Sequence, residues 1–264
     1  MELKIKQKNT FIATGGKVFD PSKPVLLMLH GAGMDHTVWS MQARYFAHHG
    51  FSVLNPDLPG HGRSDGSPPG SIPEYSAWVI DLLIELGVRD VYLMGHSMGS
   101  LIALACAVQL KEKVQKLALL GTLPHIQVHP SLLKSAQNND HVAYETIVGW
   151  GVGRRAQMGG HKAPGSWVTG ANMRLLEAGA PNLLGSDLTA CDNWEDGLKM
   201  CAEVLCPALL LLGSDDKMTP PKGTQKIADT IKDCRTIILK EAGHMMMMEQ
   251  PDQTLDSLST FFER

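Results

Sequence analysis

The sequence predicts an α/β fold in which a mostly parallel, doubly wound sheet is covered by helices on both faces. Six short runs of the 264-residue chain are apolar without alternation, which is the pattern of strands buried on both faces. Longer segments with helical spacing of apolar residues separate these runs, and this repetition of strand and helix is typical of a parallel sheet. The stretch 124–190 interrupts the alternation and indicates an inserted helical segment.

The elements follow in chain order. The segments MELKIKQ (1–7) and TFIATGG (10–16) predict an antiparallel hairpin at one edge of the sheet. The apolar runs predict buried strands at 24–30, 51–57, 90–96, 114–121, 207–213 and 235–243. Helical periodicity predicts helices at 39–49, 72–86, 98–110, 221–231 and 252–263.

Residues 124–190 contain no run with the character of a strand. They hold helical pieces such as SLLKSAQ, HVAYETIVGWG and GANMRLLEAG, joined by breaks rich in glycine and proline. We interpret this stretch as a helical insertion over one end of the sheet, within a core formed by 1–123 and 191–264. The alternative is that these helices are further layers covering the sheet.

Composition argues against several classes of function. The net charge of −3 offers no broad basic face for nucleic acid. The first residues lack the apolar core of a signal peptide and no run has the length of a membrane span, so we expect a cytoplasmic protein without a membrane partner. The cysteines are Cys106, Cys191, Cys201, Cys206 and Cys234, and they include no CxxC pair. We therefore expect reduced, mostly buried thiols and no metal site.

Ser97 lies in the stretch VYLMGHSMGS, between a predicted strand and a predicted helix. Ligands of parallel sheets bind beyond the carboxyl ends of the strands, where this serine stands. The pattern Gly-x-Ser-x-Gly in this context predicts a sharp turn that exposes the hydroxyl group. Gly95 and Gly99 would avoid collisions with the neighbouring strand and helix. Ser97 is thus the candidate nucleophile.

A serine hydroxyl needs a base, and the base needs an acid that orients it. His244 follows the last strand, and Asp215 and Asp216 follow the strand before it. Serine, aspartate and histidine at three strand ends, in this order, predict a catalytic triad. The backbone amide of Met98, at the start of a helix, and that of Ala32, in the loop after the first central strand, are candidate donors to an oxyanion.

The motifs HGAG, PDLPGHGRSD, GHSMGS, GSDDKMTP and AGHMMMMEQP together resemble the α/β-hydrolase superfamily, in its serine-nucleophile, esterase-like branch with a helical cap. The resemblance covers nearly the whole chain. It implies an α/β-hydrolase fold with 124–190 as the cap. It implies Asp216, three residues after Gly213, as the acid, with Asp215 as the fallback. It also implies that the amides of Ala32 and Met98 form the oxyanion hole.

We therefore expect a serine hydrolase, without cofactor or metal, that cleaves a carboxylic ester or thioester of a small to medium acyl group through an acyl-enzyme. A C–C bond hydrolase, a lactonase and an acyltransferase are alternatives on the same triad. A tryptophan often follows the histidine in C–C bond hydrolases, whereas Met245 stands here. A ligand receptor on a hydrolase scaffold, without turnover, is the alternative from a different class.

The remaining candidates concern binding. Met34, Trp150, Met158, Trp167 and Met245 are candidates for the substrate pocket, because methionine and tryptophan fill irregular apolar space. Packing within the insertion is the competing explanation for the tryptophans and Met158. A pair of adjacent arginines, Arg154 and Arg155, is either a solvated surface or a docking patch for an acidic carrier.

Overall fold

A computed structural model of the protein describes residues 1–163 and 165–263. Its strands form one eight-stranded sheet in the order β1-β2-β4-β3-β5-β6-β7-β8. Strands β3 to β8 run parallel, and β1 and β2 form an antiparallel hairpin at one edge. The predicted α/β fold with a mostly parallel sheet is confirmed. The strands are β1 (Glu2–Ile5), β2 (Lys8–Ala13), β3 (Val25–Leu29), β4 (Ser52–Pro56), β5 (Val91–His96), β6 (Val114–Leu120), β7 (Ala208–Gly213) and β8 (Cys234–Leu239).

The strand order reverses between β3 and β5. The chain passes from β3 outward to β4, then returns to the other side of β3 with β5 and continues outward to β8. The loops after β3 and β5 therefore leave the sheet in opposite directions, which opens a crevice between them. Ligands of open α/β sheets bind at such a point.

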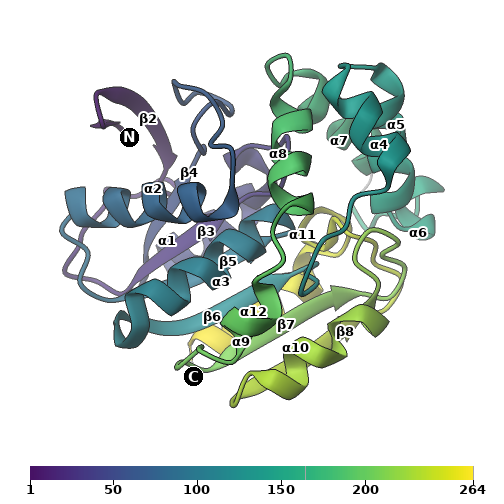
Figure 1. The fold of residues 1–264 in the computed structure, drawn as a ribbon. Coiled ribbons are helices and arrows are strands. Elements are labelled where there is room, and N and C mark those ends of the chain that lie inside the picture. Colours follow the sequence, from purple (N-terminus) through teal and green to yellow (C-terminus); the bar gives the residue numbers. More distant parts are fainter. Residues whose placement is uncertain (164, 264) are drawn as a thin grey trace.

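Helices cover both faces of the sheet (Figure 1). Side chains alternate between the two faces along each strand, so Leu27 and Leu93 join one apolar cluster while Leu26 and Met94 join the other. The first cluster includes residues of α2 and α3, and the second includes residues of α1 and α12. These core helices are η1 (His36–Trp39), α1 (Ser40–His48), α2 (Ile72–Glu85), α3 (Met98–Leu110), η2 (Lys111–Lys113), η3 (Pro221–Thr224), α10 (Gln225–Thr230), α11 (Met246–Glu249) and α12 (Pro251–Phe262).

The segment between β6 and β7 is helical. It contains α4 (Pro130–Gln137), α5 (His141–Gly151), α6 (Arg154–Gln157), α7 (Val168–Glu177), α8 (Leu183–Asp192) and α9 (Gly197–Cys201). Helices α4 to α8 stand together beside the sheet as a separate group (Figure 1), whereas α9 contacts α3 and α10. The predicted domain boundary at 190 falls inside α8. Pro164 of the predicted insertion and Arg264 of the predicted core lie outside the described residues.

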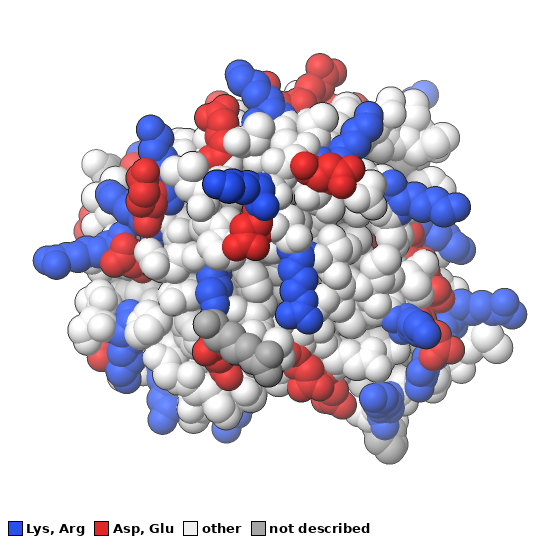
Figure 2. Space-filling model, turned by 90° about the horizontal axis from the view of Figure 1, so that it is seen from below, with Lys and Arg blue, Asp and Glu red and all other residues white. Residues whose placement is uncertain are grey.

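Charged side chains of both signs are interspersed over the face seen from below in Figure 2. This agrees with the small net charge of the chain. Among the described residues, no helix combines the length and the apolar character needed to cross a membrane.

Candidate active site

Ser97 occupies a strained turn between β5 and α3. Its backbone angles are φ 54° and ψ −120°. Residues other than glycine rarely adopt this conformation, which costs roughly 1–3 kcal/mol. A side chain at Gly95 would overlap the backbone of Gly99, and one at Gly99 would overlap the carbonyl groups of Leu29 and His30. The two glycines therefore allow β5, α3 and the end of β3 to approach closely around the serine.

Asp216 and His244 come from the loops after β7 and β8 and contact each other directly. Nδ1 of His244 donates a hydrogen bond to Oδ2 of Asp216 over 2.7 Å. The hydroxyl of Thr219 donates to the same oxygen over 2.6 Å. Oδ1 accepts from the backbone N–H groups of Met218 and Thr219, each over 2.8 Å. Both carboxylate oxygens thus accept hydrogen bonds from neighbouring groups, which fixes the orientation of the Asp216 side chain relative to the His244 ring.

The hydrogen bonds also keep Asp216 ionised. Burial alone would raise the pKa of this carboxyl group, but the adjacent His244 and the donors of Thr219 outweigh it and lower the pKa to about 2. Asp215 lies beside it, with a carboxylate that accepts from the hydroxyl of Ser214. It is Asp216, and not the fallback Asp215, that contacts the histidine.

The second ring nitrogen of His244, Nε2, is the one that Asp216 does not contact. Because Asp216 accepts the hydrogen of Nδ1, the lone pair of the neutral ring is on Nε2. This nitrogen is buried and has no hydrogen-bond partner among residues 1–163 and 165–263. His244 and Ser97 line the same cavity. Catalytic hydrogen bonds are often long before a substrate binds.

The two candidate oxyanion donors flank Ser97. A side chain at Gly31 would lie 3.2 Å from Cβ of Ser97, which puts the loop after β3 against the serine. Ala32 of this loop lines the cavity. Met98 begins α3, and the first N–H groups of a helix have no partner within the helix and carry partial positive charge.

Asp187 on α8 holds the loop after β3 from the side of the helical segment, and our sequence interpretation missed it. Its buried carboxylate accepts from the backbone N–H of Gly33 over 2.8 Å and from the hydroxyl of Tyr75 over 2.6 Å. Nε2 of His61 donates to it over 2.8 Å, while Nδ1 of His61 faces the carbonyl of Pro59 at 3.0 Å. Both ring nitrogens therefore meet acceptors, which favours a protonated ring. Burial would lower the pKa of His61, but Asp187 outweighs it and the pKa is raised.

Glu249 holds the loop that carries His244, and it was also missed. Its carboxylate accepts from the N–H groups of Gly243 and Met245, on either side of the histidine, and from Gly153 between α5 and α6. Burial raises the pKa of this carboxyl group, although the three donors act in the opposite sense. The carboxylate thus joins the histidine loop to the helical segment.

Two further histidines support loops near the site. Nε2 of His30 accepts from the backbone N–H of Leu58, and its Nδ1 faces the carbonyl of Gly31. Burial lowers the pKa of His30 to about 4, so the ring is neutral. Nε2 of His96 donates to the carbonyl of His244 over 2.9 Å, and burial lowers the pKa of this ring as well. Neither ring lines the cavity.

The cavity has a volume of about 240 Å³. Among the five pocket candidates, Met34, Trp150 and Met245 line it. The expectation for Met158 and Trp167 was wrong: these side chains are 75% and 72% exposed and do not line it. They lie in or next to the connection between α6 and α7, on the outer surface. Further lining residues that we did not identify from the sequence include Leu132, Ile147, Val148, Asn172, Leu176, Leu188 and Met218.

Arg154 and Arg155 line an open surface pocket together with Asp215 and Glu241. A guanidinium nitrogen of Arg155 lies 2.7 Å from a carboxylate oxygen of Glu241. The two positive charges of this pocket are thus matched by two negative ones. The docking of an acidic carrier at this patch stays a prediction.

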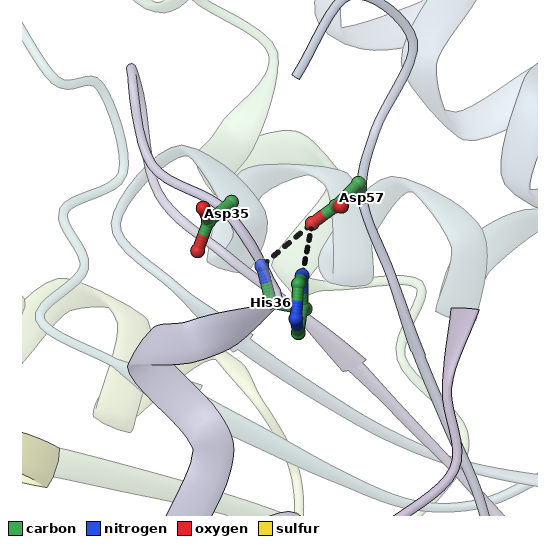
Figure 3. A group of neighbouring side chains, drawn as sticks. All are labelled: Asp35, His36 and Asp57. Carbon is green, nitrogen blue, oxygen red and sulfur yellow. Dashed lines mark hydrogen bonds and ion pairs between the residues drawn. The ribbon is translucent and has the colours of Figure 1, made fainter. Parts of the chain in front are cut away.

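Asp35, His36 and Asp57 form a group whose donor atoms lie close enough to hold a metal ion (Figure 3). One oxygen of Asp57 accepts from the backbone N–H and from Nδ1 of His36, and the other accepts from the backbone N–H of Arg63. Asp35 instead accepts from Thr37 and caps η1. Because these hydrogen bonds already use the oxygens of Asp57, the group acts as a clasp between η1 and the end of β4.

Comparisons with known proteins show the family to which the chain belongs. The model of the family described as alpha/beta hydrolase fold matches residues 24–251. The (E)-2-((N-methylformamido)methylene)succinate hydrolase of Acinetobacter baylyi is 26% identical over 245 residues, which cover 90% of each chain. The pimeloyl-(acyl-carrier protein) methyl ester esterase of Aromatoleum aromaticum is 29% identical, over 88% of this chain and 95% of the esterase.

Among solved structures, the enol-lactonase of Burkholderia xenovorans superposes with a TM-score of 0.88 over 100% of both chains, at 20% identity. At this identity the similarity concerns the fold alone. The named relatives are hydrolases with different substrates, so they support hydrolysis and leave the substrate open. The family model extends from just before β3 to the start of α12 and so covers well over half of the chain. The protein therefore belongs to the family of the alpha/beta hydrolase fold.

Proposed function

We propose that the protein is a serine hydrolase that cleaves a carboxylic ester or thioester through an acyl-enzyme. The observation that carries this proposal is that one cavity is lined by Ser97 and by His244, whose buried Nε2 has no partner among the described residues. The hydrogen bond between His244 and Asp216 supports it, because a serine becomes nucleophilic only with an oriented base.

In the proposed mechanism Nε2 of His244 takes the proton of the Ser97 hydroxyl as its oxygen attacks the carbonyl carbon. The amides of Ala32 and Met98 stabilise the oxyanion of the tetrahedral intermediate. His244 then donates the proton to the leaving alcohol or thiol, and the acyl group remains on Ser97. Water, activated by the same ring, releases the acid. Asp216 stays ionised throughout and stabilises the imidazolium ion.

The cavity supports a small acyl group. Its volume of about 240 Å³ lies below the range of roughly 300–1,000 Å³ that is typical of drug-sized ligands. Its buried lining is mostly aliphatic, with Leu132, Ile147 and Leu188 from three helices of the insertion. We therefore expect α4, α5 and α8 to act as a cap that limits the length of the acyl chain.

The first test is kcat/KM for p-nitrophenyl esters from acetyl to dodecanoyl, with Ser97→Ala beside the native protein. We expect the native protein to prefer short acyl chains, and the variant to lose at least about 10³-fold in kcat because the triad acts as a unit. Labelling by a fluorophosphonate, located on Ser97 by mass spectrometry, would establish the nucleophile independently.

Other outcomes of this test select the alternatives. Full activity of the Ser97→Ala protein would contradict the proposed mechanism. One burst of product without further turnover would favour a receptor on a hydrolase scaffold. Faster consumption of ester when a second alcohol or thiol is added, with its acylated product, would favour an acyltransferase. Lactones and C–C bonded diketones, assayed in the same way, test the two remaining hydrolase alternatives.

A further inference from the structure

The lining of the cavity includes a buried amide side chain that the proposed mechanism does not use. Asn172 on α7 is 3% exposed and lines the cavity with Ser97. The other polar side chains of the lining, apart from Ser97, His244 and the thiol of Cys191, are exposed and belong to Gln127, His129 and Lys217.

The amide group of Asn172 has a defined orientation. Its Nδ2 donates to the carbonyl of Val168, one turn earlier in α7, over 2.9 Å. Because only nitrogen can donate to that carbonyl, the opposite orientation of the amide would put two oxygen acceptors together. The atom of the amide group that does not contact Val168 is therefore Oδ1. It is buried and accepts no hydrogen bond from the residues that the structure describes.

A buried acceptor of this kind is costly unless a donor reaches it. The surrounding cavity wall is apolar, with Leu176, Leu188 and Ile147 among its buried members. A water molecule is held in a protein interior by two to four polar partners, and an aliphatic wall supplies few. A substrate that carries its own donor satisfies the atom better.

The position of Asn172 relates it to the reaction. Leu176 follows one turn later on the same side of α7 and also lines the cavity. Its Cδ2 lies 3.1 Å from where a side chain at Gly33 would begin, so this end of α7 touches the loop that carries Ala32. Asn172 precedes Leu176 by four residues, so it lies about 6 Å from Leu176 along the axis of α7, at about 1.5 Å per residue.

We propose that Oδ1 of Asn172 accepts a hydrogen bond from the substrate, and that the substrate therefore carries an O–H or N–H donor a few atoms from the cleaved bond. This inference rests on the proposed serine hydrolase function and narrows its substrate class. Hydroxyacyl and acylaminoacyl esters fit this description. A chain with a carboxylate or a ketone at the same place does not, since acceptor would face acceptor.

The test uses methyl esters of acids that carry a hydroxyl group at carbon 3, 4, 5 or 6, each paired with the ester in which a methyl group replaces the hydroxyl. Release of acid gives kcat/KM for both members of each pair. At one position at least, we expect the native protein to prefer the hydroxyl ester by about 10-fold or more. We expect Asn172→Leu to lose that preference and Asn172→Asp, which keeps an acceptor oxygen, to retain part of it.

Asn138→Leu is the matched control, because Asn138 is exposed at the end of α4 and lies outside the cavity lining. It should keep the preference of the native protein. Thermal unfolding of each variant shows whether it is folded. If Asn172→Leu fails to fold, the comparison rests on Asn172→Asp and on the native protein alone.

Binding separates this inference from the proposed function. The Ser97→Ala protein should bind the preferred hydroxyl ester about 10-fold more tightly than its methyl partner in calorimetry, and addition of Asn172→Leu should remove the difference. Equal affinity and equal kcat/KM within every pair would overturn the inference, as would a preference that survives Asn172→Leu. Undiminished hydrolysis by Ser97→Ala would instead overturn the proposed function.

Discussion

At the scale of single residues, two adjacent aspartates show how the structure separates a functional group from its neighbour. Asp216 is 4% exposed, and each of its oxygens accepts hydrogen bonds. Asp215 lies on the surface pocket beside Arg154 and Arg155 and bonds to the hydroxyl of Ser214. Of these two adjacent aspartates, Asp216 thus orients the histidine, whereas Asp215 lies at the surface pocket.

We expect Asp216→Asn to reduce kcat by roughly 10³–10⁴-fold, because an amide no longer holds His244 in the tautomer with a free Nε2 lone pair. Asp215→Asn is the matched control and should stay within about twofold of the native rate. Steady-state kinetics on the best p-nitrophenyl ester measures both. A large loss in Asp215→Asn with little effect of Asp216→Asn would reassign the acid.

At the scale of elements, α8 is joined to the loop after β3 by Asp187. The buried pair of Asp187 and His61, with Tyr75 and the amide of Gly33, connects the helical segment to the candidate oxyanion hole. Removing one partner of a buried, hydrogen-bonded ion pair leaves the other without compensation and costs about 3–5 kcal/mol. Loss of the Asp187 carboxylate should therefore change both the position of α8 and the conformation of the loop after β3.

We expect Asp187→Asn to lower the free energy of unfolding by about 3 kcal/mol and to reduce kcat. The pKa of His61 is raised in the folded protein, so the stabilisation by its charge is complete below the pKa of an unfolded histidine, about 6.5. It is lost as the pH rises from there through the folded pKa. The stability difference between native protein and variant should therefore shrink between pH 6 and 9.

Urea unfolding at several pH values measures this difference. Asp140→Asn is a suitable control, because Asp140 is exposed at the start of α5 and its side chain makes no capping hydrogen bond. A difference between native protein and Asp187→Asn that stays constant from pH 6 to pH 9 would argue against a charged His61.

At the scale of the whole molecule, one apolar cluster runs through the sheet and the helical segment. It includes Leu27 and Leu93 of the sheet together with Leu132, Ile147 and Leu188 of the inserted helices. Although the sequence suggests a core and an insertion, this continuity predicts that both parts unfold together. The buried cysteines provide local probes, since Cys106 lies in α3 and Cys191 in α8.

We expect Cys106 and Cys191 to resist thiol reagents in the native protein and to become reactive at the same urea concentration. Burial raises the pKa of both thiols, and it raises the pKa of Cys201 to about 12 and that of Cys206 to about 11, so the reactive thiolate is scarce. Mass spectrometry of peptides labelled along a urea series measures each cysteine. Labelling of Cys191 at a clearly lower urea concentration would show that the helical segment opens separately.

What the sequence determined by itself rests on local patterns. Unbroken apolar runs distinguish strands covered on both faces, and the connection rules of parallel sheets then bring their carboxyl ends to one edge. The turn at Ser97 needs glycines two positions away on either side, so it too is visible in the sequence. The fold class was predicted from these features, and the family was predicted from the resemblance of five motifs; both are confirmed. The strand ends also indicated Ser97 and His244, whereas only the resemblance favoured Asp216 over Asp215 as the candidate acid.

The tertiary structure alone decided how the helical segment meets that edge. A helix pattern does not state which neighbour its polar residue will find, so Asp187 looked like any aspartate, although it bonds Gly33 across 154 positions. The orientation of each inserted helix likewise placed Trp150 and Asn172 at the cavity and left Trp167 on the surface. Such choices depend on the packing of distant segments against one another, which no local spacing of residues encodes.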